Sequence, residues 1–140
     1  TATLTASSAT DGLDVTTGTA VDYGAGDSLY VDAGDSNVVI ENIGCSGGFY
    51  TPGCANYFAA TNGGGIQDVG FVDSWDEIGE VPGGGFLTEG RSVLVIEGHL
   101  YVVDVGDGTF AKVLVTASDV AAGTVDVTTA HQDGATIYFK

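Results

Sequence analysis

The last fifty residues constrain the fold most, because they read as successive β-strands with the turns between them. The β-branched and aromatic residues that favour strands gather in five short runs, at 93–96, 100–105, 110–115, 125–129 and 136–139. Asp107-Gly108 and Asp133-Gly134 lie between such runs, where a tight hairpin needs a residue with positive φ. This pattern predicts antiparallel strands joined by short turns.

The rest of the chain extends this prediction to a single all-β domain. A chain of 140 residues can bury a core of its own, and 44% of its residues are hydrophobic. Glycine is common and proline is rare, as in proteins with many short strands. Further strand-like runs lie at 1–6, 13–21, 28–31, 38–43, 56–60 and 66–72. We expect an antiparallel β-sandwich or flattened barrel of about eight to ten strands, with at most one short helix, near 73–80.

The charge of the chain excludes several classes of partner. Nineteen acidic residues against three basic ones give a formal net charge of −16. A surface this negative repels nucleic acids and anionic lipids, so we expect neither as a partner. No run of 18 apolar residues occurs, so we expect no membrane span. The chain starts at Thr1 and contains no methionine. We interpret this as a processed N-terminus left by a secretory signal, which predicts an extracellular or cell-surface location.

Cys45 and Cys54 are the only cysteines. An even cysteine count in a secreted chain favours a disulfide. By restricting the unfolded chain, this bond would stabilise the fold by about 2–3 kcal/mol. A metal site is the alternative, but two cysteines without a nearby histidine make a poor zinc site. We therefore predict a disulfide between them.

Residues 1–6 alternate in character, as a strand with one polar and one apolar face does. A polar stretch, 7–12, separates this run from the next apolar segment. The strand can therefore pair with its own sheet or add to the sheet of a neighbouring subunit. In the second case residues 1–10 carry the donated strand and 11–140 form the single β-domain. The expected subunit interface consists of Thr1, Ala2, Thr3, Leu4, Thr5 and Ala6.

Clustered carboxylates predict a calcium site. Asp32, Asp35, Asp104 and Asp107 place oxygen atoms on two predicted loops, where Ca²⁺ could gather them together with backbone carbonyls. Solvated loops are the alternative interpretation, because neither spacing matches an EF-hand loop. We expect no other cofactor.

Side chains with catalytic or sugar-binding chemistry are few. The acidic residues around Trp75 could be read as a glycosidase pair beside a sugar-stacking ring, but an acidic surface turn anchored to the core by the indole is the interpretation we favour. These acidic residues are Asp73, Asp76, Glu77 and Glu80. Tyr50, Tyr57 and Trp75 could form a sugar-binding platform. The chain has neither a nucleophile elbow nor a phosphate-binding loop, so we expect no enzyme.

Two stretches resemble known proteins. Residues 66–91 read IQDVGFVDSWDEIGEVPGGGFLTEGR, and residues 98–115 read GHLYVVDVGDGTFAKVLV. Their order is similar to that of β-domains in secreted bacterial and archaeal surface proteins. The segment DGTFAKVLV, followed by HQDG, resembles the C-terminal part of the HmuY-like haem carriers. This resemblance implies an extracellular all-β protein. It also makes His99 and His131, the two histidines, candidate haem ligands.

These features together predict a structural protein. We expect a secreted subunit of an extracellular filament, a homopolymer assembled by donor-strand complementation, in which residues 1–8 of one copy complete the sheet of the next. Removing residues 1–8 should then abolish polymers without unfolding the monomer. Because stacking subunits of charge −16 is unfavourable, salt or Ca²⁺ at interface carboxylates should favour assembly. The alternative function is a secreted module that binds haem or a glycan.

Overall fold

The described part of the chain is built from strands. The computed structural model describes residues 2–6, 10, 12–21, 38–43, 55–60, 64–73, 79–80, 83–88, 92–106 and 108–132. These residues form eleven strands and no helix, so the predicted all-β class is confirmed and the strand count exceeds the expected eight to ten. The strands are β1 (Ala2–Thr5), β2 (Gly12–Asp14), β3 (Thr19–Val21), β4 (Val38–Ile43), β5 (Ala55–Ala60), β6 (Gly65–Phe71), β7 (Leu87–Thr88), β8 (Ser92–Leu94), β9 (His99–Asp104), β10 (Phe110–Asp119) and β11 (Thr124–His131).

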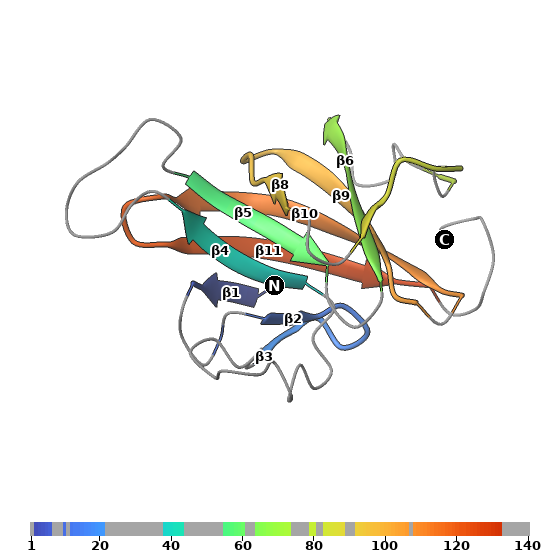
Figure 1. Cartoon of the computed structure of the whole chain (residues 1–140), viewed down its shortest axis with the longest axis horizontal. Coiled ribbons are helices and arrows are strands. Elements are labelled where there is room, and N and C mark those ends of the chain that lie inside the picture. The colour runs from blue at the N-terminus through green and yellow to red at the C-terminus, as the bar shows by residue number, and fades with distance from the viewer. Residues whose placement is uncertain are drawn as a thin grey trace.

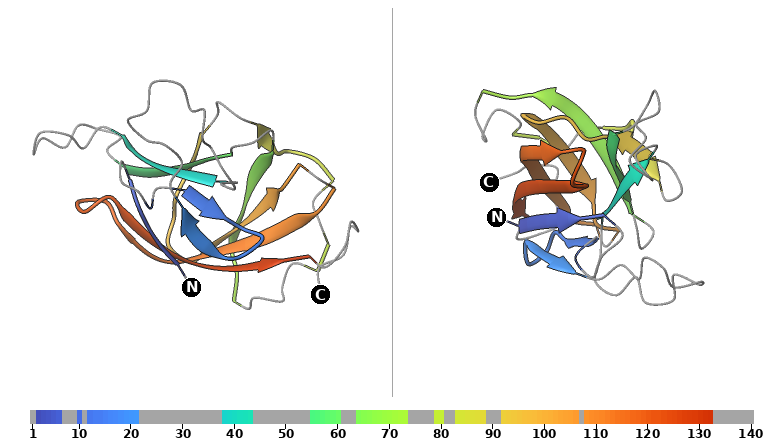
Figure 2. Two further views of the ribbon diagram at one scale, coloured as in Figure 1. Left: turned by 90° about the horizontal axis from the view of Figure 1, so that it is seen from below. Right: turned by 90° about the vertical axis from the view of Figure 1, so that its left-hand side faces the viewer.

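The strands form two antiparallel sheets that pack in the manner of a sandwich (Figures 1 and 2). Sheet A has the order β1-β11-β10-β9-β6-β7, and sheet B has the order β3-β2-β4-β5-β8. The described strands do not close into a barrel, because neither order returns to its first strand. β9, β10 and β11 follow one another as a meander, as the strand-and-turn pattern of the C-terminal half predicts.

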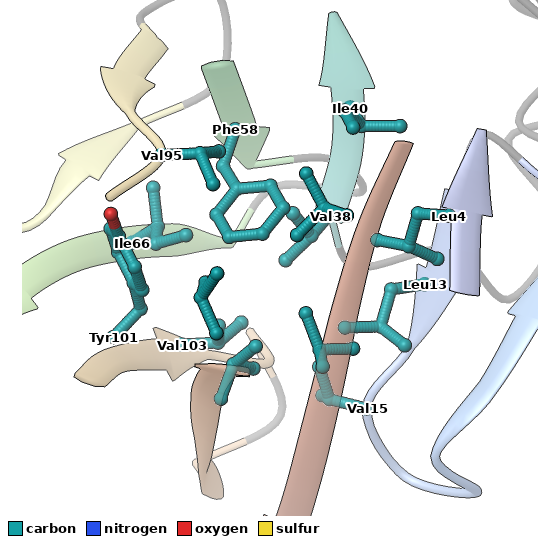
Figure 3. Packing of buried hydrophobic residues seen from close by; sticks show 14 of the residues in the cluster. Leu4, Leu13, Val15, Val38, Ile40, Phe58, Ile66, Val95, Tyr101 and Val103 are labelled. Atoms are coloured by element: carbon teal, nitrogen blue, oxygen red, sulfur yellow. The ribbon is translucent and has the colours of Figure 1, made fainter. Parts of the chain in front are cut away.

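The core lies between the two sheets and receives side chains from both (Figure 3). Phe58 of β5 meets Tyr101 of β9 edge to face, with ring centroids 5.2 Å apart. The remaining large side chains with less than 2% exposure are aliphatic, which suits close packing of two pleated faces. They are Leu4, Leu13, Ile40, Ile66, Leu100, Val15, Val38, Val102, Val103 and Val113.

β9 is buried on both faces, since successive residues from His99 to Val103 are all buried, and its two edges pair with β10 and β6 of sheet A. Tyr101 and Val103 point into the core cluster. Leu100 and Val102, on the opposite face, are also fully buried. Lys112 of β10 pairs with Val102 and is only 4% exposed, so its side chain is buried along with theirs. On β10 Phe110 packs against Phe86, with centroids 5.8 Å apart.

Residues 13–21 form a hairpin, and the single strand predicted there is wrong. Asp14 explains the reversal, since its Oδ1 accepts hydrogen bonds from the Thr16 backbone N–H at 2.9 Å and from the Thr16 hydroxyl at 2.6 Å. The Gly18 N–H donates to the Asp14 carbonyl at 2.8 Å. Gly18 has φ +72°, and a Cβ there would lie 2.6 Å from Thr129 Oγ1 of β11. The turn therefore needs glycine both for its dihedral angle and for its close approach to sheet A.

Asn56 joins the two sheets through its side chain. It lies on β5 of sheet B and is fully buried. Its Nδ2 donates to Ser118 Oγ at 3.2 Å, to the Asp119 carbonyl at 3.3 Å and to the Thr124 carbonyl at 3.2 Å. All three acceptors belong to the end of the β10–β11 hairpin in sheet A. Asn56 thus holds that hairpin, the neighbour of β1, against sheet B.

Several sequence predictions fall on positions outside the described residues. They include the disulfide, the strands at 28–31 and 136–139, the turn at Asp133-Gly134 and the helical turn, of which 74–78 are not described. Also outside are Thr1, Asp32, Asp35, Cys45, Tyr50, Cys54, Trp75, Asp76, Glu77 and Asp107. In the ranges that the structure does describe, there is no helix that could cross a membrane.

Candidate functional site

β1 occupies the edge of sheet A. It runs antiparallel to β11, and the partners are Ala2 with Val127, Thr3 with Asp126, Leu4 with Val125 and Thr5 with Thr124. The Ala6 N–H continues this ladder to the Gly123 carbonyl at 2.9 Å. Among the described strands, β11 is the one hydrogen-bonded neighbour of β1. We call the position that β1 fills beside β11 the β1 site.

The two faces of β1 differ as the sequence predicts. Leu4 is 0% exposed and belongs to the core cluster, which also contains Leu13 and Ile40 (Figure 3). Ala2 and Ala6 are partly buried and pack against the same cluster. On the outer face, the Thr3 hydroxyl donates to Asp126 Oδ1 at 2.6 Å. The strand therefore inserts one large apolar side chain and presents threonine outward. In the single chain it completes its own sheet.

A cavity of about 260 Å³ lies at the junction of β1, β11 and β10, and is lined by Ala2, Thr3, Thr116 and Asp126. A β-bulge between Val115 and Ala117 makes Thr116 the extra residue of β10. The Thr116 hydroxyl donates to the Asp126 carbonyl at 3.2 Å. Its described lining thus offers one carboxylate and two hydroxyls, and Ala2 and Thr3 of that lining belong to β1.

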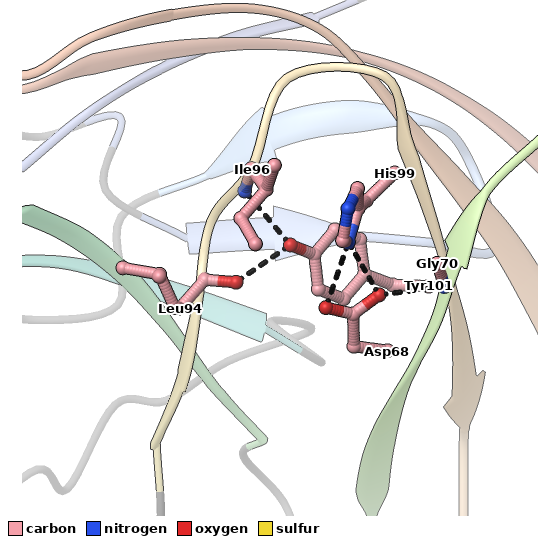
Figure 4. A network of polar contacts seen from close by, with 6 residues as sticks. All are labelled: Asp68, Gly70, Leu94, Ile96, His99 and Tyr101. Carbon is pink, nitrogen blue, oxygen red and sulfur yellow. Dashed lines mark hydrogen bonds and ion pairs between the residues drawn. The ribbon is translucent and has the colours of Figure 1, made fainter.

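A second polar group of residues involves β6, β9 and the 94–96 segment (Figure 4). A bulge between Asp68 and Gly70 interrupts β6, and Gly70, with φ +92°, donates its N–H to Asp68 Oδ1 at 2.8 Å. His99 Nδ1 lies 2.8 and 2.9 Å from the two Asp68 oxygens. Phe71 packs edge to face on the His99 ring with centroids 4.2 Å apart, although Phe71 itself is 73% exposed.

Tyr101 completes this group from within the core. Its hydroxyl donates to the Leu94 carbonyl at 2.6 Å and accepts from the Ile96 N–H at 2.9 Å. Burial raises the pKa of the Tyr101 hydroxyl, and the negative charge of Asp68 raises it further. The Ile96 hydrogen bond opposes the rise in pKa without cancelling it. The hydroxyl is therefore a neutral structural group that ties the 94–96 segment to β9.

The Asp68–His99 pair has the second-shell geometry of a metal ligand, because a carboxylate orients one ring nitrogen. His99 Nε2 is buried and has no hydrogen-bond partner in the described structure. A metal site needs further ligands, however, and the described ranges contain no cluster of three side chains of the metal-ligating types. No nucleophilic hydroxyl or thiol of the described residues is hydrogen-bonded to the ring. The pair therefore supports no catalytic assignment.

The two histidines do not meet at one iron atom. His131 pairs with Ala111, which in turn pairs with Val103. His131 therefore lies two strand spacings from Val103, and Val103 lies four residues along β9 from His99. These steps put the Cα atoms of the two histidines about 16 Å apart. His131 Nε2 lies 2.8 Å from Thr109 Oγ1, whereas His99 leans toward β6. Each ring is held by its own neighbour.

Of the four predicted calcium ligands, Asp104 lies among the described residues. Asp104 Oδ1 accepts the Gly106 N–H at 2.9 Å and so caps the turn after β9. Its three expected co-ligands lie at positions that the structure does not describe.

Comparison with known protein families, curated proteins and solved structures finds no match. The resemblance to HmuY-like and other secreted surface domains therefore stays a prediction. Asp126 and Asn56 are the residues near the β1 site that the sequence did not reveal. Their partners lie more than 60 positions away in the chain, so no local pattern could have identified them.

Proposed function

We propose that this protein is a secreted structural subunit that forms homopolymers by exchanging β1 between copies. One observation carries the proposal: a four-residue edge strand contributes Leu4, a wholly buried core residue, while pairing with a single described neighbour. A β1 from an identical chain would make the same backbone pairs with β11 and would place the same leucine in the core. Exchange therefore preserves the pairing of the strand with β11 and the burial of Leu4, and turns an internal pairing into a link between subunits.

A chain that has given up its β1 would have a strong tendency to accept another. Loss of the strand unpairs the edge of β11 and opens the core beside Val125 and Val127. The buried position of Leu4 therefore changes what we expect of a monomer that lacks residues 1–8. We now expect that deletion to destabilise the monomer, because it removes Leu4. Cross-linking of the full-length chain is consequently the better test.

Charge would regulate the exchange. Each copy carries a formal charge of −16, so bringing copies together raises their electrostatic energy. At about 0.15 M ionic strength the screening length falls to about 8 Å, which weakens this repulsion. Salt, or a divalent cation bound by carboxylates near the junction, should favour the polymer.

Disulfide trapping distinguishes exchange from self-pairing. Thr3 and Asp126 are paired across β1 and β11 on the outer face, at a separation that a disulfide can span. One chain carrying Thr3→Cys is mixed with another carrying Asp126→Cys under mild oxidation. Exchange should yield covalently linked dimers, and a chain with both substitutions should yield a ladder of oligomers on non-reducing gels.

Controls address the native cysteines and chance contact. Each variant mixed with the unsubstituted chain should give no such dimer. Thr5→Cys, which pairs with Thr124, should link to Asp126→Cys much more slowly, because diagonal positions lie about 7–8 Å apart. An internally linked monomer as the only product of the double variant, across protein and salt concentrations, would reject the proposal.

A further inference from the structure

We infer that the β1 site is a selective peptide-binding site that accepts an extended strand with one leucine flanked by alanines and an uncharged hydroxyl residue facing Asp126. This inference rests on the proposed function and names the partner: the β1 strand of a second copy of this chain. The selectivity follows from the inner and outer contacts of the strand taken separately.

The inner contacts select the leucine and its register. Leu4 is completely enclosed, whereas Ala2 and Ala6, two residues to either side, are only partly buried. A shift of two residues would put an alanine in the place of Leu4 and leave a cavity in the core. By analogy with buried leucine-to-alanine changes, this should weaken binding about 30-fold or more. A shift of one residue would bury a threonine hydroxyl instead.

The outer contact rejects acidic strands. The Thr3 hydroxyl donates to Asp126 Oδ1, so an aspartate or glutamate at that position would face a carboxylate across the ladder. Like charges placed directly opposite each other are unfavourable, and this chain contains nineteen acidic residues. The outer face of the site therefore discriminates against segments that place an acidic residue opposite Asp126.

Both conditions together single out β1. The chain has seven leucines, at positions 4, 13, 29, 87, 94, 100 and 114. Only Leu4 has alanine two residues before it and two residues after it. The residue before Leu4, Thr3, also meets the outer requirement. The site is thus complementary to one segment of the protein, which would direct exchange to the correct strand.

The test uses the full-length chain with Asp126→Cys and tagged synthetic peptides as probes. The first peptide carries residues 1–8 with Thr3→Cys, and the matched peptide adds Leu4→Ala. Each is incubated at about 1 mM, close to the effective concentration of a tethered strand. Incubation is done once with the native protein and once during refolding from urea. Labelled protein is measured on non-reducing gels.

The leucine peptide should be trapped about 30-fold or more efficiently than the alanine peptide. A second protein that combines Asp126→Cys with Leu4→Ala weakens its own strand and should capture the leucine peptide more completely. The unsubstituted chain has no cysteine at position 126, so neither peptide should label it there.

The outcomes separate the two proposals. Equal trapping of both peptides during refolding overturns the selectivity of the inner face for leucine, whatever the native protein does. Selective trapping during refolding but none in the native protein supports the selective site and counts against spontaneous exchange. Failure of both peptides in both arms overturns the inference, because the site then accepts no strand from another molecule.

Discussion

Replacing Asn56 by alanine should loosen the β10–β11 hairpin on which β1 docks. The change removes a fully buried amide whose Nδ2 serves three acceptors at 3.2–3.3 Å, two of them backbone carbonyls. Each lost hydrogen bond contributes about 1 kcal/mol, and truncating a fully buried side chain also leaves a cavity. We therefore expect the free energy of unfolding to fall by about 2–4 kcal/mol.

Urea denaturation of Asn56→Ala beside Ser118→Ala measures this contribution. The serine variant removes one acceptor and leaves the amide its two carbonyls, so it should lose less than about 1 kcal/mol. Asn56→Asp provides a test of the direction of the hydrogen bonds. The introduced carboxylate would face the Asp119 and Thr124 carbonyls without a proton to donate, and this environment raises its pKa.

A raised pKa in the folded state gives stability that is present below the unfolded value of about 3.9 and is lost as pH rises through the folded value. The free energy of unfolding of Asn56→Asp should therefore rise relative to that of Asn56→Ala as the pH is lowered from 7 toward 4. A loss below about 0.5 kcal/mol for Asn56→Ala, or no relative gain of Asn56→Asp in acid, would refute the role of Asn56 as a donor between the sheets.

Three further predictions concern the turns, the buried tyrosine and assembly. Gly18→Ala should destabilise the fold more than Gly70→Ala. Both glycines have positive φ, which costs about 1–2 kcal/mol for alanine, but a Cβ at Gly18 would also clash with Thr129 Oγ1. Adding Thr129→Ala should recover part of the Gly18→Ala loss, and equal thermal melts for the two glycine variants would contradict the close approach. Because the Tyr101 pKa is raised, the unfolded chain releases this proton first, and stability should fall as pH rises above about 10. Melting temperatures between pH 8 and 11 should show a shallower fall for Tyr101→Phe than for Tyr57→Phe, and parallel curves would be inconsistent with the buried hydroxyl. Polymer yield in light scattering should rise between about 0.01 and 0.15 M salt, as screening shortens from about 30 to 8 Å, and a yield independent of salt would argue against charge control.

The sequence predicted the strands more reliably than the contacts between them. Alternation in residues 1–6 and the apolar runs of the C-terminal half were sufficient to place β1, β9, β10 and β11, because both features are local. The division of 13–21 into two strands depends on the side chain of Asp14, which accepts two hydrogen bonds from Thr16. Aspartate plays this part in many turns, so the residue alone does not show where a turn will form. The sequence did show that Leu4 would lie on the apolar face of its strand.

The pairs that define the candidate sites are non-local and could not be predicted. Asp68 and His99 are 31 positions apart and meet through the pairing of β6 with β9, beside the bulge at Gly70. Thr3 and Asp126 are 123 positions apart and meet only because β1 pairs with β11. A sequence gives the chemistry of such residues but not the register that joins them, since register depends on the packing of the whole sheet.

The antiparallel ladder between β1 and β11 has a mechanical consequence for an exchanged filament. Tension transmitted through the N-terminal segment would pull β1 lengthwise along β11, with the ladder bonds lying across the direction of force. The rungs would then share the load and yield together, instead of opening one after another as a zipper does. A junction loaded in this way would resist stretching better than one whose rungs open in turn.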